Sequence, residues 1–155
     1  MTEIIKTFKT ETAHIVRGAV SERCKYNVHG HSYVWEVGIE GPVKTNGMVL
    51  DFKELQPIKE FIDKFDHAMV LWNSEDKDFI NFFMTNCKRV LVMYENTTAE
   101  NMAALVFKYT RDWLYKCHPE YKCVAVKVHE TATGCAKANS CREEDILVYC
   151  HNDQT

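Results

Sequence analysis

The sequence predicts an α+β domain whose main strands lie toward the two ends of the chain. Alternating side chains mark one pair of strands at residues 3–11 and 29–41, and a second pair at 122–131 and 145–150. Two long amphipathic segments between these pairs have helical spacing. Strands that follow one another usually lie side by side, so we expect antiparallel pairs at each end of one domain covering residues 1–155.

The first half of the chain holds the clearest strand. Residues 3–11 can form an initial strand, and residues 12–28 show no regular pattern. In residues 29–41, one parity carries only large apolar side chains, namely Tyr33, Trp35, Val37 and Ile39. Such alternation is typical of a strand with one buried face, and Gly41-Pro42 ends it.

Two helices are predicted in the middle of the chain. The first begins near Phe52 or Lys53, and its buried stripe comprises Leu55, Ile58, Phe61, Ile62 and Phe65. Residues 76–86 are ambiguous, with a short helix as one interpretation, and "RVLVMY" indicates a brief strand. The segment "NTTAEN" opens a second long helix through a threonine cap, and this helix continues to about Cys117.

Composition excludes several classes of protein. The 155 residues carry a net charge of -3, with acidic and basic residues mixed along the chain. That balance argues against a general nucleic-acid surface. No run of about 18 apolar residues is present, and the first residues lack a signal-peptide pattern. We expect a cytoplasmic protein that neither crosses a membrane nor binds nucleic acid.

The seven cysteines are numerous but do not form a zinc-ribbon pattern. In a reducing compartment disulfides are not expected. Four of the later cysteines could suggest a cluster, namely Cys117, Cys123, Cys135 and Cys141, but they lack the tight C-x2-C pairs of zinc ribbons. A four-cysteine metal site is therefore disfavoured, and buried thiols are the better interpretation.

Histidines at the start of the second strand suggest a metal site. His29 and His31 lie two apart, so both side chains point to the same face. Catalytic zinc sites usually have three protein ligands and one open position. His14, on the short connection that follows the first strand, is the best third candidate. The alternative is a chance pair of histidines on a polar sheet face.

Cys24 lies five residues before His29 and between two basic residues, Arg23 and Lys25. Positive charge and a nearby metal lower the pKa of a thiol, which would make Cys24 a base. A structural cysteine in a loop is the competing interpretation.

Two further positions carry carboxylates suited to catalysis or binding. Asp66 precedes His67 at the end of the first helix, where a carboxylate can orient an imidazole. A histidine favoured there only by the helix dipole is the alternative. Glu130 ends a strand whose same-parity residues are valines. It either meets solvent at the sheet edge or binds the paired N–H groups of a heterocycle.

Six ordered segments resemble the 6-pyruvoyl-tetrahydropterin synthase / 6-carboxy-tetrahydropterin synthase family. They are "ETAHIV", "VHGHSYVWEVGIEG", "NGMVLDFKELQ", "FDHAMVL", "NTTAENMA" and "VKVHET". The resemblance covers nearly the whole chain and implies a role for each matching residue. It implies that zinc is held by His14, His29 and His31, that Cys24, Asp66 and His67 are catalytic, and that Glu130, Thr98 and Thr131 contact the pterin.

The resemblance also implies a fold and an assembly. The tunnelling fold is a four-stranded antiparallel sheet with two helices on one face. Its sheets close into a barrel in trimers, which usually pair as hexamers with active sites between subunits. The implied substrate is 7,8-dihydroneopterin triphosphate, and candidate triphosphate donors are Arg17, Arg23, Lys25 and Lys127.

Departures from the family pattern leave the subtype open. The C-x4-H gap from Cys24 to His29 lies between the C-x3-H of carboxy enzymes and the C-x5-H of animal pyruvoyl enzymes. Thr97 stands where proline is usual, and the stretch after Glu130 looks long for a hairpin connection. Its "ETATGC" favours the 6-carboxy-tetrahydropterin synthase. The alternatives are the pyruvoyl synthase and a non-catalytic zinc or pterin-binding module.

Overall fold

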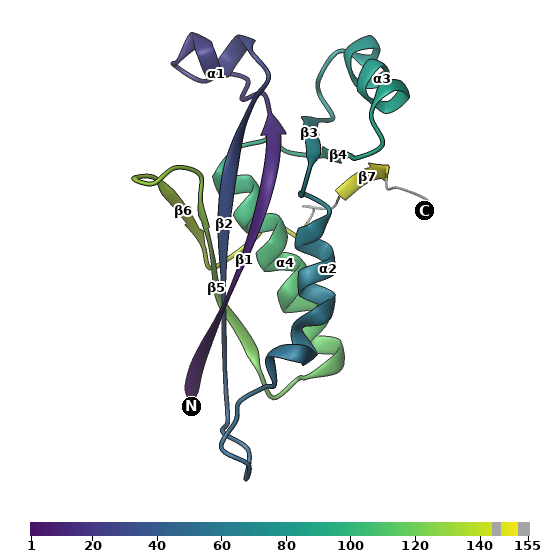
Figure 1. Ribbon diagram of the computed structural model, residues 1–155. Helices are drawn as coiled ribbons and strands as arrows, with labels where there is room; N and C mark the ends of the chain where they lie inside the picture. Colours follow the sequence, from purple (N-terminus) through teal and green to yellow (C-terminus); the bar gives the residue numbers. More distant parts are fainter. Residues whose placement is uncertain (144–146, 152–155) are drawn as a thin grey trace.

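One long strand pair organises the structure, a computed structural model that describes residues 1–143 and 147–151 (Figure 1). Strands β1 (Thr2–His14) and β2 (His29–Gly41) are antiparallel and pair without interruption, from Thr2 opposite Gly41 to His14 opposite His29. β1 is longer than the predicted strand 3–11. His14 is therefore the last residue of a strand and not part of a loop.

The sheet around this pair is mixed, with the order β6-β5-β2-β1-β3-β4-β7. β3 (Ala68–Trp72) runs parallel to β1, and β4 (Val90–Met93) runs parallel to β3. The prediction of four antiparallel strands is therefore wrong. β3 escaped prediction because "AMVL" is buried on both faces and does not alternate. The brief strand predicted at "RVLVMY" is β4.

The C-terminal strands pair differently from the prediction. β5 (Lys122–His129) pairs with β2 on one side and forms a hairpin with β6 (Cys135–Ala138) on the other. β7 (Leu147–His151) pairs with β4 at the opposite edge of the sheet. The predicted strand 145–150 is thus present from residue 147, but it is not the partner of β5. Residues 145 and 146 lie outside the described part of the chain.

Two helices cover one face of the sheet. η1 (Phe52–Leu55) leads into α2 (Gln56–Asp63), and α4 (Ala99–Cys117) lies beside α2 (Figure 1). Both bury apolar side chains against β2 and β5, as the helical spacing predicted. The capping signals are also present, since Thr98 Oγ1 accepts the Asn101 N–H and Asp51 caps η1.

Two further helices complete the end of the molecule where β1 finishes. α1 (Glu22–Tyr26) interrupts the segment 12–28 that was predicted to be irregular. α3 (Lys77–Asn86) resolves the ambiguity at 76–86, and Asp76 caps it. Side chains of α3 pack on the buried residues of β3 and β4. Among the described residues, no helix has the length and apolar character needed to cross a membrane.

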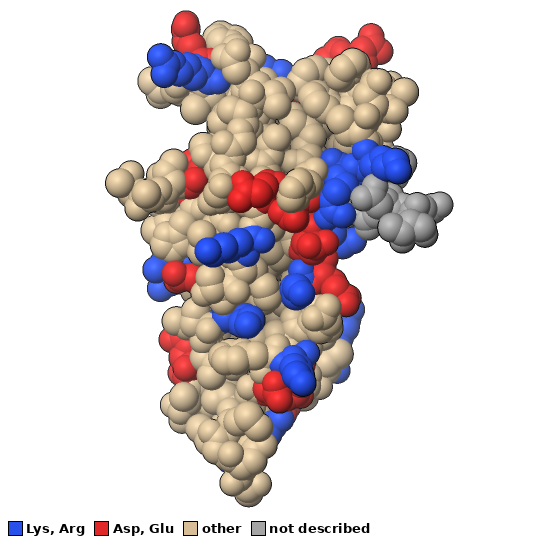
Figure 2. All heavy atoms as spheres, viewed as in Figure 1, with Lys and Arg blue, Asp and Glu red and all other residues tan. Residues whose placement is uncertain are grey.

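Charged side chains are interspersed on the face drawn in Figure 2, where basic and acidic groups alternate along the molecule. Elsewhere on the described surface, ion pairs include Lys122 with Glu40 at 2.7 Å and Arg111 with Glu143 at 2.9 Å. The face drawn in Figure 2 therefore presents no continuous basic surface of the kind that binds a nucleic-acid backbone.

Candidate active site

Three histidines meet where the β1–β2 ladder ends. His14 and His29 are directly opposite each other, and His31 lies two residues further along β2, on the same face. Their ring centroids lie 4.5 Å apart for His14 and His29, 5.2 Å for His14 and His31, and 5.1 Å for His29 and His31. The shared face of His29 and His31, and the approach of His14 from the neighbouring strand, agree with the sequence prediction.

Backbone carbonyls orient two of these rings. His14 Nδ1–H donates to the Thr97 carbonyl at 2.7 Å, and His29 Nδ1–H donates to the Asn27 carbonyl at 2.9 Å. Each bond leaves Nε2 unprotonated and able to bind a metal. His31 Nε2 is buried and has no hydrogen-bond partner in the described part of the chain. A buried nitrogen without a partner is costly, unless an ion binds there.

The triad fits a zinc ion. One nitrogen from each ring lies within 4.8 Å of the others, close enough for all three to reach one ion through short Zn–N bonds. Burial lowers the pKa of His14 to about 4 and also lowers the pKa of His31. Both rings are therefore neutral at pH 7, which is the form that binds metals.

Thr97 connects the triad to the start of α4. Its side chain is fully buried, and Oγ1–H donates to the Ile15 carbonyl at 2.8 Å. Its own carbonyl accepts the His14 N–H, so one residue binds the end of β1 at two points. This is the position where the family pattern has proline, which would lack the hydroxyl.

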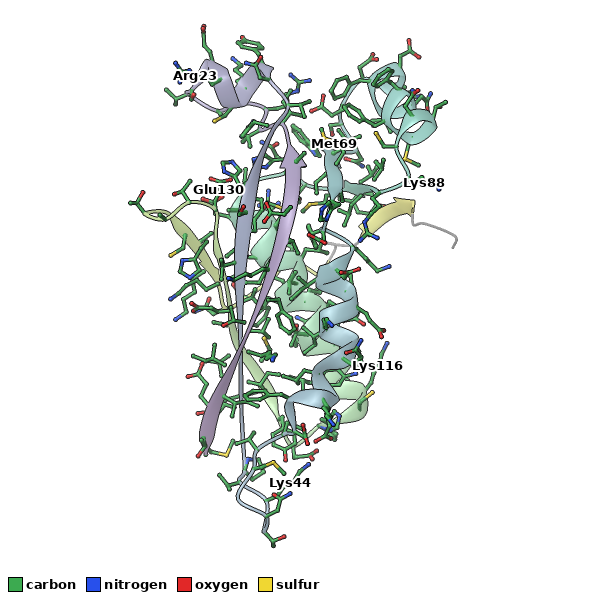
Figure 3. All side chains as sticks on the ribbon, in the orientation of Figure 1. Arg23, Lys44, Met69, Lys88, Lys116 and Glu130 are labelled. Atoms are coloured by element: carbon green, nitrogen blue, oxygen red, sulfur yellow. The ribbon has the colours of Figure 1, made fainter. Side chains whose placement is uncertain are left out.

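Glu130 lies beside the histidines, directly after β5, and Figure 3 shows it next to β2. Its Oε1 accepts the Tyr33 hydroxyl hydrogen at 3.0 Å and lies 3.7 Å from Nε2 of both His14 and His31. Burial, together with the Glu130 charge, raises the pKa of Tyr33, so its hydroxyl stays protonated. Tyr33 was not predicted as a site residue, although its parity with His29 and His31 places it on their face.

Cys24 and two histidines of the triad line one cavity, which we call the thiol cavity. This cavity, of about 570 Å³, is lined by Cys24 from α1, by His29 and His31, and by Glu130 and Thr131 at the end of β5. Thr98 and Glu100 line it from the start of α4, where the helix dipole is positive. Hydroxyls of both threonines already accept backbone N–H groups, Thr98 from Asn101 and Thr131 from Gly134.

Asp66 and His67 form the predicted carboxylate–imidazole pair. His67 Nδ1 and Asp66 Oδ2 are 2.9 Å apart, and Asp66 Oδ1 accepts the Glu11 backbone N–H at 2.8 Å. Burial alone would raise the pKa of Asp66, but the Glu11 N–H, His67 and Arg89 outweigh it and lower this pKa. The pair follows α2 in a turn where His67 has a φ of 53°. It is not at a helix terminus, so the helix-dipole interpretation does not apply.

His67 and Cys24 lie in different cavities. His67 lines a cavity of about 740 Å³ together with Glu11, Ala13 and Ser32, which alternate with the triad residues and so lie on the opposite face of the sheet. In Figure 3, Met69 and Lys88 of this cavity lie on the β3 side, and Glu130 lies on the β6 side. His31 lines both cavities.

The candidate triphosphate donors are not gathered around the thiol cavity, and none of the four is among its lining residues. Arg17 makes a two-pronged bond with Glu75, with Nε–Oε1 at 2.8 Å and Nη2–Oε2 at 2.9 Å. Lys127 lies 3.5 Å from Glu36. Lys25 stacks over the Tyr26 ring at 5.1 Å, and Arg23 is exposed on α1.

The later cysteines do not form a metal cluster. Within residues 1–143, the histidine triad is the one group of three or more His, Cys, Asp or Glu side chains placed to hold an ion. Cys123 is buried, and burial raises its pKa to about 12, whereas Cys117 and Cys135 are exposed. The buried-thiol interpretation therefore holds for Cys123 alone among these three.

Comparison with known proteins finds relatives that are named as tetrahydropterin synthases. The model of the family "6-pyruvoyl tetrahydropterin synthase" matches residues 3–141. A 6-carboxy-5,6,7,8-tetrahydropterin synthase of Helicobacter pylori strain J99 is 36% identical over 142 residues, covering 87% of this chain and 71% of that protein. The enzyme of strain 26695 is also 36% identical, covering 81% of this chain and 66% of its own length.

Solved structures of the same fold include more distant proteins. An uncharacterised Wolinella succinogenes protein superposes with a TM-score of 0.76 at 19% identity, covering 89% of this chain and 97% of that chain. Caenorhabditis elegans 6-pyruvoyl tetrahydropterin synthase superposes with a TM-score of 0.64 at 24% identity, covering 90% and 95%. At these identities the likeness concerns the fold. The match to residues 3–141 shows that the chain belongs to the 6-pyruvoyl tetrahydropterin synthase family.

Proposed function

We propose that the protein is a zinc-dependent 6-carboxy-5,6,7,8-tetrahydropterin synthase that acts on 7,8-dihydroneopterin triphosphate. The observation that carries the proposal is the triad, in which carbonyl bonds leave Nε2 of His14 and His29 unprotonated and Nε2 of His31 has no hydrogen-bond partner among the described residues. The choice of the carboxy product rests on the Helicobacter pylori relatives, which bear that name.

The residues would divide the chemistry among them. His14, His29 and His31 would hold zinc, which as a Lewis acid acidifies neighbouring hydroxyl and C–H groups. Glu130 would accept the paired N–H groups of the pterin ring and so position its side chain. Cys24, in the same cavity, would remove a proton from that side chain as thiolate. His67, oriented by Asp66, would return a proton.

The position of His67 supports a shared active site. Because His67 and Cys24 line cavities on different faces of the sheet, the His67 that serves a given Cys24 would come from a neighbouring subunit. We propose a trimer whose sheets close into a barrel, paired as a hexamer. Closure would also cover the edge strand β6, which is otherwise free to pair.

The pyruvoyl synthase is the second candidate, favoured by the name of the family whose model matches residues 3–141. The two reactions differ in the carbon skeleton of the product. Incubation of the zinc-loaded protein with dihydroneopterin triphosphate, followed by mass spectrometry, should detect 6-carboxy-tetrahydropterin and acetaldehyde. A 6-pyruvoyl product would select the second candidate. An unchanged substrate would favour a binding module.

Variants test the assigned residues. His29→Ala and His31→Ala should lose most bound zinc in metal analysis, and unchanged zinc in both would refute the triad. Cys24→Ala should keep zinc and bind the pterin but lose about two to four powers of ten in turnover. Near wild-type turnover of Cys24→Ala would shift the role of base to another group, His67 first.

A further inference from the structure

The Glu130 carboxylate lies close to the Tyr33 hydroxyl and to two histidines of the triad. Its side chain is one-third exposed in the thiol cavity, and its backbone N–H is fixed by a bond to the Gly134 carbonyl at 3.1 Å. One oxygen, Oε1, accepts the Tyr33 hydroxyl hydrogen and lies 3.7 Å from Nε2 of both His14 and His31. A small rotation of this side chain is therefore enough to bring the carboxylate closer to the triad.

A carboxylate at this distance competes for the metal. Asp and Glu oxygens are good zinc ligands, and a fourth protein ligand turns an open catalytic site into a closed structural one. A carboxylate bound to the metal also loses an oxygen for the substrate. Some other group must therefore keep Glu130 available to a pterin.

Tyr33 is placed to be that group. Its side chain is fully buried in β2, with its ring against those of His31 and Trp35 at centroid distances of 5.5 and 6.1 Å. The hydroxyl position is thus fixed by the strand and by packing. It donates to Glu130 at 3.0 Å, and its other near atoms are the two ring nitrogens of His14, each at 3.4 Å.

We propose that Tyr33 is a positioning residue whose hydroxyl holds the Glu130 carboxylate as a receptor for the N–H groups of a pterin, and prevents it from becoming a fourth metal ligand. This inference rests on the proposed function, because it takes Glu130 as the pterin anchor. It assigns to Tyr33, which follows His29 and His31 in "HGHSY", a part in substrate binding beyond its place in the core.

Tyr33→Phe tests the inference, because it removes the hydroxyl and keeps the ring. Fluorescence titration of the zinc-loaded variant with 7,8-dihydroneopterin should show affinity weakened by about tenfold to a hundredfold. Zinc affinity, measured by competition with a chelating dye, should rise. The control is Tyr109→Phe, the same change at a tyrosine that stacks on Phe61 at 3.9 Å outside the site, and it should alter neither affinity.

A double variant separates the possible outcomes. If Tyr33 acts through Glu130, adding Tyr33→Phe to Glu130→Gln should change neither pterin nor zinc affinity further. Unchanged pterin affinity in Tyr33→Phe would overturn the inference, and so would a fall in zinc affinity, which would assign Tyr33 to the triad itself. A wild-type protein that binds zinc but no pterin would instead overturn the proposed function, and this role with it.

Discussion

At the scale of single residues, two buried threonines differ in whether their hydroxyls are hydrogen-bonded: Thr97, just before α4, and Thr110, within it. Thr97 Oγ1–H donates to the Ile15 carbonyl, whereas Thr110 Oγ1 is buried without a partner in the described residues. Both side chains are fully buried. A buried hydroxyl stabilises a protein only when it is bonded, so the two threonines should respond differently to the same substitution.

Thr97→Val should lower the free energy of unfolding by about 1–2 kcal/mol, because it leaves the Ile15 carbonyl without its partner. Thr110→Val should leave the free energy of unfolding unchanged or raise it, since it removes a buried hydroxyl that has no hydrogen-bond partner among the described residues. Urea unfolding of the metal-free proteins measures both. Zinc content should stay at the wild-type level in Thr97→Val, because the carbonyl that orients His14 remains. Equal destabilisation by the two variants would contradict the assignment of the Thr97 bond.

The side chains of the site were more predictable from the sequence than the backbone groups that orient them. The period of two in β2 places His29 and His31 on one face, and the same rule applied once more finds Tyr33. The carbonyls of Thr97 and Asn27, which orient His14 and His29, could not be predicted in this way. Every residue has a backbone carbonyl. Which carbonyl accepts a hydrogen bond depends on the fold, so the residue types do not identify it.

At the scale of elements, the short helix that carries Cys24 is held by a brace. Arg17 donates to both oxygens of Glu75, in the turn before α3, and also to the Lys25 carbonyl at 3.1 Å. Glu75 is 4% exposed, so this is a shielded, two-pronged ion pair. The brace joins the segment around α1 to the body of the protein.

Glu75→Gln should loosen that segment, because a neutral amide cannot accept two charged N–H groups. Amides of residues 16–26 should exchange hydrogen about tenfold faster, whereas those of α4 should not change. Asp112→Asn, which weakens the more exposed pair between Lys108 and Asp112, is the control and should leave residues 16–26 unaffected. Uniformly faster exchange throughout Glu75→Gln would indicate general destabilisation and contradict a local brace.

Prediction succeeded for elements with one exposed face. β1, β2, α2 and α4 carry a clear period of two or 3.6, and the sequence located all four. β3 lacks alternation because both its faces are covered. The partner of β5 was assigned wrongly because alternation identifies a strand but says nothing of its neighbour. Pairing depends on the path of the connection, and here a short hairpin to β6 takes the place beside β5.

At the scale of the whole molecule, the positions of Cys24 and His67 on different sides of the sheet predict complementation between chains. Cys24→Ala and His67→Ala should each be inactive alone. Refolding an equal mixture should restore about a quarter of the wild-type active sites, because a site then needs one intact residue from each of two subunits. Light scattering should show a trimer or hexamer.

Two results would contradict this assembly. A particle of 18.0 kDa at micromolar concentration would be a monomer with no neighbour to supply His67. A mixture that stays inactive, although it forms the same oligomer as the wild type, would mean that His67 does not serve a neighbouring site. Refolded wild-type protein is the control for losses during mixing.

The β1–β2 ladder ends at the pair His14 and His29, immediately before the connection that carries Cys24. The position of the metal ligands and the position of the thiol can therefore change independently in evolution. Residues added to or removed from the connection between the two strands change the reach of Cys24. The ladder fixes the two histidines independently of the length of that connection. A lineage can therefore lengthen or shorten its C-x4-H gap and adjust its acid–base chemistry while the metal ligands stay in register.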